Sequence, residues 1–153
     1  MVQRSQGSYH KTMKTLAILI AAFTPAMLVI HLSTARILKA WNGEADSWIK
    51  RQFPPRRALR VEALYWMLTL AAWPLWRAPA WEIAVVLFSG IHLSIWLVGE
   101  LRPIHLTDHR EGVGALTRRL HRTIIAFDLI EAVVLVAVGG VALLFAVAGG
   151  AAV

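Results

Sequence analysis

The sequence contains no cysteine among its 153 residues. This absence excludes disulfides, iron–sulfur clusters, thiolate zinc sites, covalently attached c-type haem and cysteine nucleophiles. Charge is also scarce, since Asp, Glu, Lys and Arg make up 16% of the chain while hydrophobic residues make up 58%. A soluble globular domain does not have this composition. We therefore expect the lipid bilayer to be the solvent of this chain.

The hydrophobic residues gather into blocks of about twenty, which as helices are long enough to cross a hydrocarbon core of roughly 30 Å. The sequence thus predicts an all-α fold, an integral membrane bundle of four transmembrane helices. We expect one transmembrane domain over residues 1–153. Its predicted spans are residues 15–35, 59–77, 81–100 and 122–147.

The first loop has a pattern of its own between residues 36 and 60. Apolar side chains recur there at near-helical spacing among charged ones, at Ile37, Leu38, Trp41, Trp48 and Ile49. This pattern predicts a short amphipathic helix that lies in the membrane interface. The sequence Phe53-Pro54-Pro55 should end it, because the residue before a proline disfavours helix.

The net charge of +7 does not predict nucleic-acid binding, because the basic residues flank apolar spans. The first and third loops hold 12 Lys and Arg residues, whereas the two termini and the second loop hold 4. The positive-inside rule then places both termini outside and the two long basic loops in the cytoplasm. A bacterial inner membrane is the expected location.

Ionisable residues inside a span are costly and usually turn toward one another. The candidates for a ligand, proton or cation site are His31, Glu62, His92, Asp128 and Glu131. Chain direction brings the ends of spans one and three to the side where spans two and four start. We therefore expect these five side chains in the cytoplasmic half of the bundle, with His92 near its middle. Two interpretations stay open: a chemical cluster, or hydrogen bonds that join helices.

Small residues recur along the last span at steps of three, four and seven, at Ala132, Gly139, Ala142 and Ala146. Such a stripe lets helix backbones approach closely and predicts the packing face. The last apolar stretch exceeds one crossing. Whether Asp128 and Glu131 lie within the membrane or at its interface therefore stays open.

Haem is one candidate cofactor, because b-type haem needs two facing histidines and no cysteine. The candidate axial ligands are His31, His92 and His121. The sequence Arg118-Arg119-Leu120-His121-Arg122 resembles the basic, histidine-bearing helix starts of membrane cytochrome b subunits and succinate dehydrogenase anchors, over five residues. This resemblance implies haem b or quinone. By residue count, His31 and His92 should differ in depth by roughly 9 Å.

A divalent metal is a second candidate cofactor. His105 and His109 are four residues apart, which on a helix places both imidazoles on one side of a metal, with Asp108 as a further ligand.

Three functions follow from these patterns, and whether the chain is an enzyme stays open. The first is a small carrier or accessory subunit of a larger membrane complex, in transport or electron transfer, with copies of itself or other membrane subunits as partners. The second is a haem-binding or quinone-binding redox subunit. The third is a membrane metalloenzyme that uses the pair His105 and His109.

Overall fold

The computed structural model describes residues 2–41, 47–101 and 114–148, and the side chains of residues 7–41, 48–49, 51–101 and 118–148. All regular structure in these ranges is helical, as the sequence predicts. The elements are α1 (Val2–Leu32), α2 (Thr34–Trp41), α3 (Ser47–Gln52), α4 (Pro55–Ala71), the 3₁₀ helix η1 (Trp73–Leu75), α5 (Pro79–Leu101) and α6 (Gly114–Ala148).

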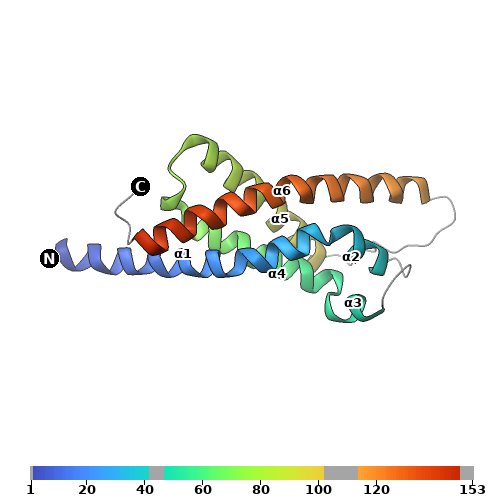
Figure 1. Ribbon diagram of the computed structural model, residues 1–153, viewed down its shortest axis with the longest axis horizontal. Coiled ribbons are helices and arrows are strands. Elements are labelled where there is room, and N and C mark those ends of the chain that lie inside the picture. The colour runs from blue at the N-terminus through green and yellow to red at the C-terminus, as the bar shows by residue number, and fades with distance from the viewer. Residues whose placement is uncertain (1, 42–46, 102–113, 149–153) are drawn as a thin grey trace.

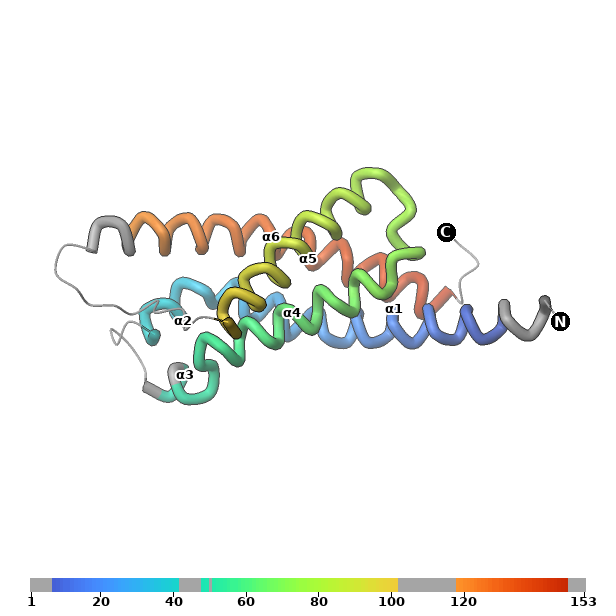
Figure 2. Tube along the Cα trace, turned by 180° about the vertical axis from the view of Figure 1, so that it is seen from behind, coloured from blue at the N-terminus to red at the C-terminus, as the bar shows by residue number. Residues whose placement is uncertain are grey.

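Two helix pairs form the body of the molecule (Figure 1). The helices α1 and α6 run side by side in opposite directions and make the most extensive contact between elements. The helices α4 and α5 form the second pair, joined through η1. Seen from behind, α4 and α5 cross α1 obliquely (Figure 2). The start of α1 and the end of α6 lie at the same end of the molecule.

Three of the described helices are long and apolar enough to cross a membrane: Gly7–Leu32 in α1, Pro79–Leu101 in α5 and Arg118–Ala148 in α6. Integration into a membrane agrees with this finding. The helix α4 has 17 residues, or roughly 25 Å of rise, and its first half carries Arg56, Arg57, Arg60 and Glu62. The predicted count of four crossings is therefore not confirmed by helix length and hydropathy.

The outer surface of α5 and α6 is apolar. Large side chains that are at least half exposed include Ile83, Val86 and Leu87 on α5 and Val133, Leu144 and Val147 on α6. Water would not favour such a surface, whereas lipid tails match it. His92 of α5 and Glu131 of α6 are instead buried in the interior.

The first loop differs from the single interfacial helix that the sequence predicts. The first predicted span ends earlier, because α1 stops at Leu32 and α2 follows after a turn at Ser33. A second short helix, α3, precedes the two prolines, and Pro54 is extended while Pro55 begins α4. The buried side chains of α2 include Ile37 and Leu38, and α2 packs on α6. Ordinary core burial therefore explains the apolar face of α2.

The link between α4 and α5 holds a second difference. The sequence pattern assigns Trp73, Trp76 and Trp81 to an aromatic belt at the membrane surface. In the structure Trp76 has no exposed surface, and its indole N–H donates a hydrogen bond of 2.7 Å to the carbonyl of Thr69. The tight turn through η1 folds this side chain back under α4, so Trp76 closes the core at that end.

The helices α1 and α6 approach closely at Gly139. A Cβ atom built there would lie 2.6 Å from the side chain of Thr24, which is closer than real Cβ contacts. The buried Thr24 hydroxyl also lies 3.0 Å from the Tyr65 hydroxyl of α4. Gly139 thus lets three helices meet around one pair of hydroxyls.

Gly139→Ala should destabilise the protein by about 1–3 kcal/mol, because the added methyl group displaces Thr24 and overpacks a closed contact. Gly140→Ala is the matched control, since a Cβ atom there meets nothing within 4 Å and alanine favours helix over glycine by about 1 kcal/mol. Thermal unfolding in detergent measures both. Equal midpoints for the two variants would contradict the close approach.

Candidate functional site

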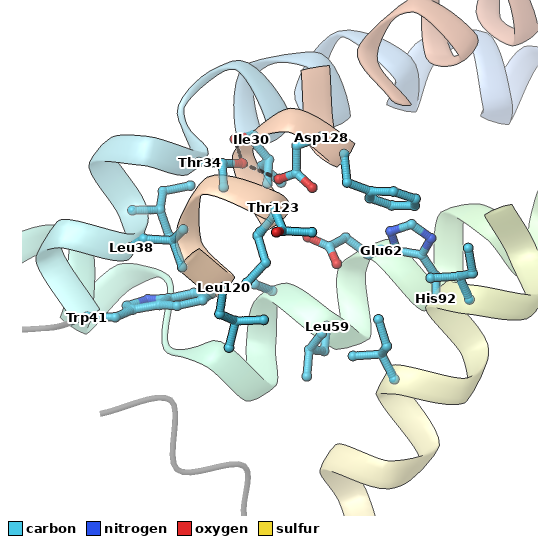
Figure 3. Close-up of a pocket in the computed structure, with 16 residues that line it drawn as sticks. Ile30, Thr34, Leu38, Trp41, Leu59, Glu62, His92, Leu120, Thr123 and Asp128 are labelled. Carbon is cyan, nitrogen blue, oxygen red and sulfur yellow. Dashed lines mark hydrogen bonds between the residues drawn. The ribbon is translucent and has the colours of Figure 1, made fainter. Parts of the chain in front are cut away.

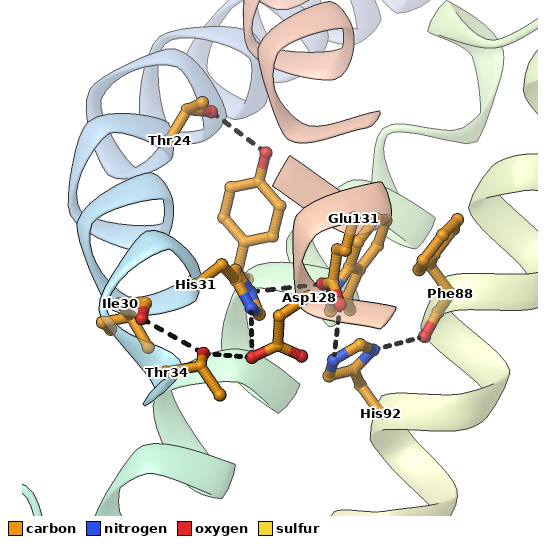
Figure 4. Close-up of polar contacts among 10 residues, drawn as sticks. Thr24, Ile30, His31, Thr34, Phe88, His92, Asp128 and Glu131 are labelled. Carbon is orange, nitrogen blue, oxygen red and sulfur yellow. Dashed lines mark hydrogen bonds and ion pairs between the residues drawn. The ribbon is translucent and has the colours of Figure 1, made fainter. Parts of the chain in front are cut away.

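Two histidines and a glutamate from three helices converge in the interior (Figure 4). His31 lies in the last turn of α1, His92 in the middle of α5 and Glu131 in α6. All three side chains are buried, and Glu131 has no exposed surface. We call these three residues the triad.

The distances in the triad are those of a closed polar centre. His31 Nε2 lies 3.3 Å from Glu131 Oε1, and His92 Nε2 lies 3.2 Å from Glu131 Oε2. One ligand atom from each residue lies within 4.8 Å of the others. Two ligands bound to zinc at 2.0–2.1 Å with a tetrahedral angle stand roughly 3.3–3.4 Å apart. Both histidine-to-glutamate distances are close to that separation.

Each member of the triad has a neighbour that fixes its orientation. His92 Nδ1 lies 2.8 Å from the Phe88 carbonyl, which can only accept, so this nitrogen carries a proton and Nε2 faces Glu131. The Trp66 indole donates a hydrogen bond of 2.9 Å to Glu131 Oε1. Asp128 Oδ2 lies 3.4 Å from His31 Nδ1. Pairing of this kind aims the remaining imidazole nitrogen, as the outer shells of metal sites do.

Three atoms of the triad are buried and still lack a hydrogen-bond partner in the described structure: His31 Nδ1, His31 Nε2 and Glu131 Oε2. Leaving a buried polar group unsatisfied costs about 1–3 kcal/mol. A neutral His92 would also point the lone pair of Nε2 at a carboxylate oxygen, which is repulsive. The centre therefore requires a proton or a metal cation between these side chains.

A cavity of about 400 Å³ adjoins the triad (Figure 3). His92, Asp128 and Glu62 contribute its ionisable groups, and Thr34 and Thr123 contribute hydroxyls. The Thr34 hydroxyl donates to Asp128 and anchors that carboxylate. The remaining lining is apolar and includes Leu38, Trp41, Leu59, Leu120 and Phe127. This volume and mixed lining are typical of small-molecule sites.

The structure brings the five candidates from the spans into one region, with four of them in the triad and its contacts and Glu62 in the cavity wall. The predicted difference in depth between His31 and His92 is wrong, since their ring centroids are 6.2 Å apart. Residue counts assumed parallel helices, whereas α5 crosses α1 obliquely. These residues are candidates on geometry alone.

The third haem candidate, His121, does not join the triad. His121 is ten residues before Glu131 in the same helix, roughly 15 Å along its axis. The proposed metal ligands His105, Asp108 and His109 lie outside the described residues.

Sequence reasoning missed the aromatic shell of the site. Trp66 is fully buried, and its ring stacks on Phe88 and His92 with centroids 5.6 and 5.7 Å away. Phe127 of α6 packs against the same two side chains. The spacing of Glu62 and Trp66 by four residues was the available signal, because it puts both on one face of α4.

Trp66→Phe should lower the stability of the metal-free protein by about 1–3 kcal/mol, because phenylalanine keeps the ring packing but removes the donor to a buried carboxylate. Trp73→Phe is the control, since Trp73 is 39% exposed. Chemical unfolding in detergent with a chelator present measures the difference. If both variants unfold alike, the hydrogen bond to Glu131 carries no stability.

Two imidazole nitrogens and a carboxylate form a donor set that suits divalent transition metals. A proton shared by the same groups would also satisfy them electrostatically. Comparison with protein-family models, with curated proteins and with solved structures finds no match for the chain.

Proposed function

We propose that this chain is a small membrane protein that binds one divalent transition-metal ion in its interior, with His31, His92 and Glu131 as ligands. The observation that carries the proposal is the convergence of two buried imidazoles on one buried carboxylate, at 3.3 and 3.2 Å, with no hydrogen bond formed at His31 or at Glu131 Oε2. Buried charges in proteins are paired or coordinate metals. An ion would replace the missing hydrogen bonds of both residues at once.

The orientation of the ligands supports a metal over a simple ion pair. A structural ion pair needs one histidine beside a carboxylate, whereas here two imidazoles approach the two oxygens of one carboxylate. The Phe88 carbonyl, Asp128 and the Trp66 indole each hold one of the three ligands. Three protein ligands leave a fourth position open, as in sites that exchange or activate what they bind.

The triad does not fit haem. A bis-histidine haem needs a slot as wide as the macrocycle between its two imidazoles, and here Glu131 lies between them and His92 stacks on Trp66. The ion would instead serve a carrier or an accessory subunit of a membrane complex, which remains our proposal for the wider role. Exposed apolar faces on α5 and α6 support such a role, because they suit lipid or other membrane subunits.

We further propose that α4 and η1 together complete a fourth crossing. The helix α4 pairs with α5, which is long enough to cross, and Arg60 binds Glu100 near the end of α5 through contacts of 2.5 and 3.0 Å. Both arginine nitrogens engage the carboxylate, so the pair fixes α4 and α5 at that end.

The absence of cysteine gives a direct test of the topology, because single cysteines can be introduced without a background. With four crossings and both termini outside, Ser8→Cys and Arg77→Cys should react with a membrane-impermeant maleimide added to intact cells. Arg57→Cys and Arg119→Cys should react only after the membrane is opened. Labelling of Arg77→Cys and Arg57→Cys from the same side would rule out a crossing by α4.

The metal is tested on protein purified in mild detergent, stripped with a chelator and reloaded with Zn²⁺ or Co²⁺. We expect one ion per chain by elemental analysis, and visible d–d absorption of the Co²⁺ form of the kind that histidine and carboxylate ligands give. His31→Ala and His92→Ala should each lower affinity at least a hundredfold. Trp66→Phe should lower it about 10–100-fold, as loss of an outer-shell partner does.

The matched control is His10→Ala. His10 also lies in α1 but is exposed and packs beside Phe145. Its removal should leave affinity and stoichiometry unchanged. Equal metal binding by the His31→Ala, His92→Ala and His10→Ala variants would place the ion elsewhere, and no binding by the wild type would return the triad to a proton-sharing contact between helices.

A further inference from the structure

The cavity beside the triad is acidic at one end and apolar at the other. Glu62, Asp128 and His92 lie together at one end in Figure 3, and Trp41, Leu38 and Leu120 lie toward the other. Asp128 accepts from Thr34 through Oδ2. The described structure gives Glu62 no hydrogen bond or ion pair. Two carboxylates thus line a space that supplies few donors of its own.

The acidic groups of this region outnumber its basic ones. Three carboxylates, Glu62, Asp128 and Glu131, surround the two imidazoles. Two protonated imidazoles would add two positive charges, and so would one divalent ion between neutral imidazoles. With all three carboxylates ionised, each state leaves a net charge of −1. No lysine or arginine is among the described residues that line the cavity.

A negative charge in an apolar cavity is costly unless a cation offsets it. The lining also indicates the chemical character of that cation. Outside its acidic end, the cavity is lined mostly by aliphatic and aromatic side chains, so the rest of the ligand should be apolar. Phe127, which packs against His92 at the acidic end, adds an aromatic ring, to which cations are attracted. A hydrated metal ion would make no favourable contact with the apolar part of the cavity.

We infer that the cavity between α2, α4, α5 and α6 binds an amphipathic monocation, an ammonium head on an apolar chain, with the head at Glu62 and Asp128. The chain of the ligand lies along Leu59, Leu38 and Leu120. This site adjoins the triad, since His92 borders both, but the two carboxylates that hold the head are not members of the triad. The ligand class that follows is that of lipophilic amines.

Isothermal titration in nonionic detergent micelles tests the inference with three probes that share one chain: octylammonium, octanol and octanoate. Heats of partition into empty micelles are subtracted. We expect octylammonium to bind at least tenfold more tightly than octanol, because charge-assisted hydrogen bonds are about twice as strong as neutral ones. Octanoate should bind more weakly than octanol. Equal affinity for all three probes, or a preference for octanoate, would overturn the inference.

Glu62→Gln removes a charge without changing shape. It should lower the affinity for octylammonium at least tenfold and leave the affinity for octanol within twofold. The metal stoichiometry should stay unchanged, because Glu62 is not in the triad. Glu82→Gln, on α5 and outside the cavity lining, is the matched control and should alter nothing. An unchanged octylammonium affinity in Glu62→Gln would overturn the role of this carboxylate.

A second variant tests the location without touching a charge. Thr123 lines the cavity from α6 and is exposed, so Thr123→Trp should fill the space with little effect on the core. We expect it to abolish binding of octylammonium and octanol alike while metal binding persists. Undiminished octylammonium binding in this variant would show that the amine binds elsewhere. In the wild type, amine binding without metal binding would instead count against the triad alone.

Discussion

The rest of the structure depends on a single carboxylate, that of Glu131, which has no contact with solvent. Removing an ionised carboxylate from water costs several kcal/mol even after relaxation. Three neighbouring groups offset this cost through polar contacts with Glu131: an indole N–H from α4, an imidazole from α1 and an imidazole from α5. Four helices are thus held to one point by one charge.

This arrangement sets a limit on how far apart the helices can lie. An imidazole reaches only a few ångströms from its backbone, so α1 must approach α6 closely for His31 to meet Glu131. The stripe of small residues on α6 permits that approach, and at Gly139 the backbone lies against Thr24 with no room for a methyl group. Packing two turns away therefore controls the geometry of the polar centre. The small residues of α6 therefore determine how closely the ionisable side chains of α1 and α6 can approach.

The sequence could predict the helices and the meeting of the ionisable groups, because hydropathy gives span lengths and chain direction gives shared sides. It could not predict that His31 and His92 lie 6.2 Å apart, because the crossing angle of α5 is set by side-chain packing rather than by residue count. Trp76 looked like a surface anchor, and only the turn through η1 buries it. The sequence does not predict the role of Trp66 for a similar reason, since an indole in a membrane span ordinarily contacts lipid or the membrane interface.

Asp128 and His92 connect the two regions of the site. Asp128 contacts His31 and Thr34 and also lines the cavity, and His92 contacts Glu131 and lines the same wall. With all three carboxylates ionised, a divalent ion at the triad and two protonated imidazoles leave the same net charge facing a cation in the cavity. Exchange of two protons for one divalent ion at the triad should therefore change the affinity of the cavity for a cation only slightly, because the potential that attracts this cation stays the same.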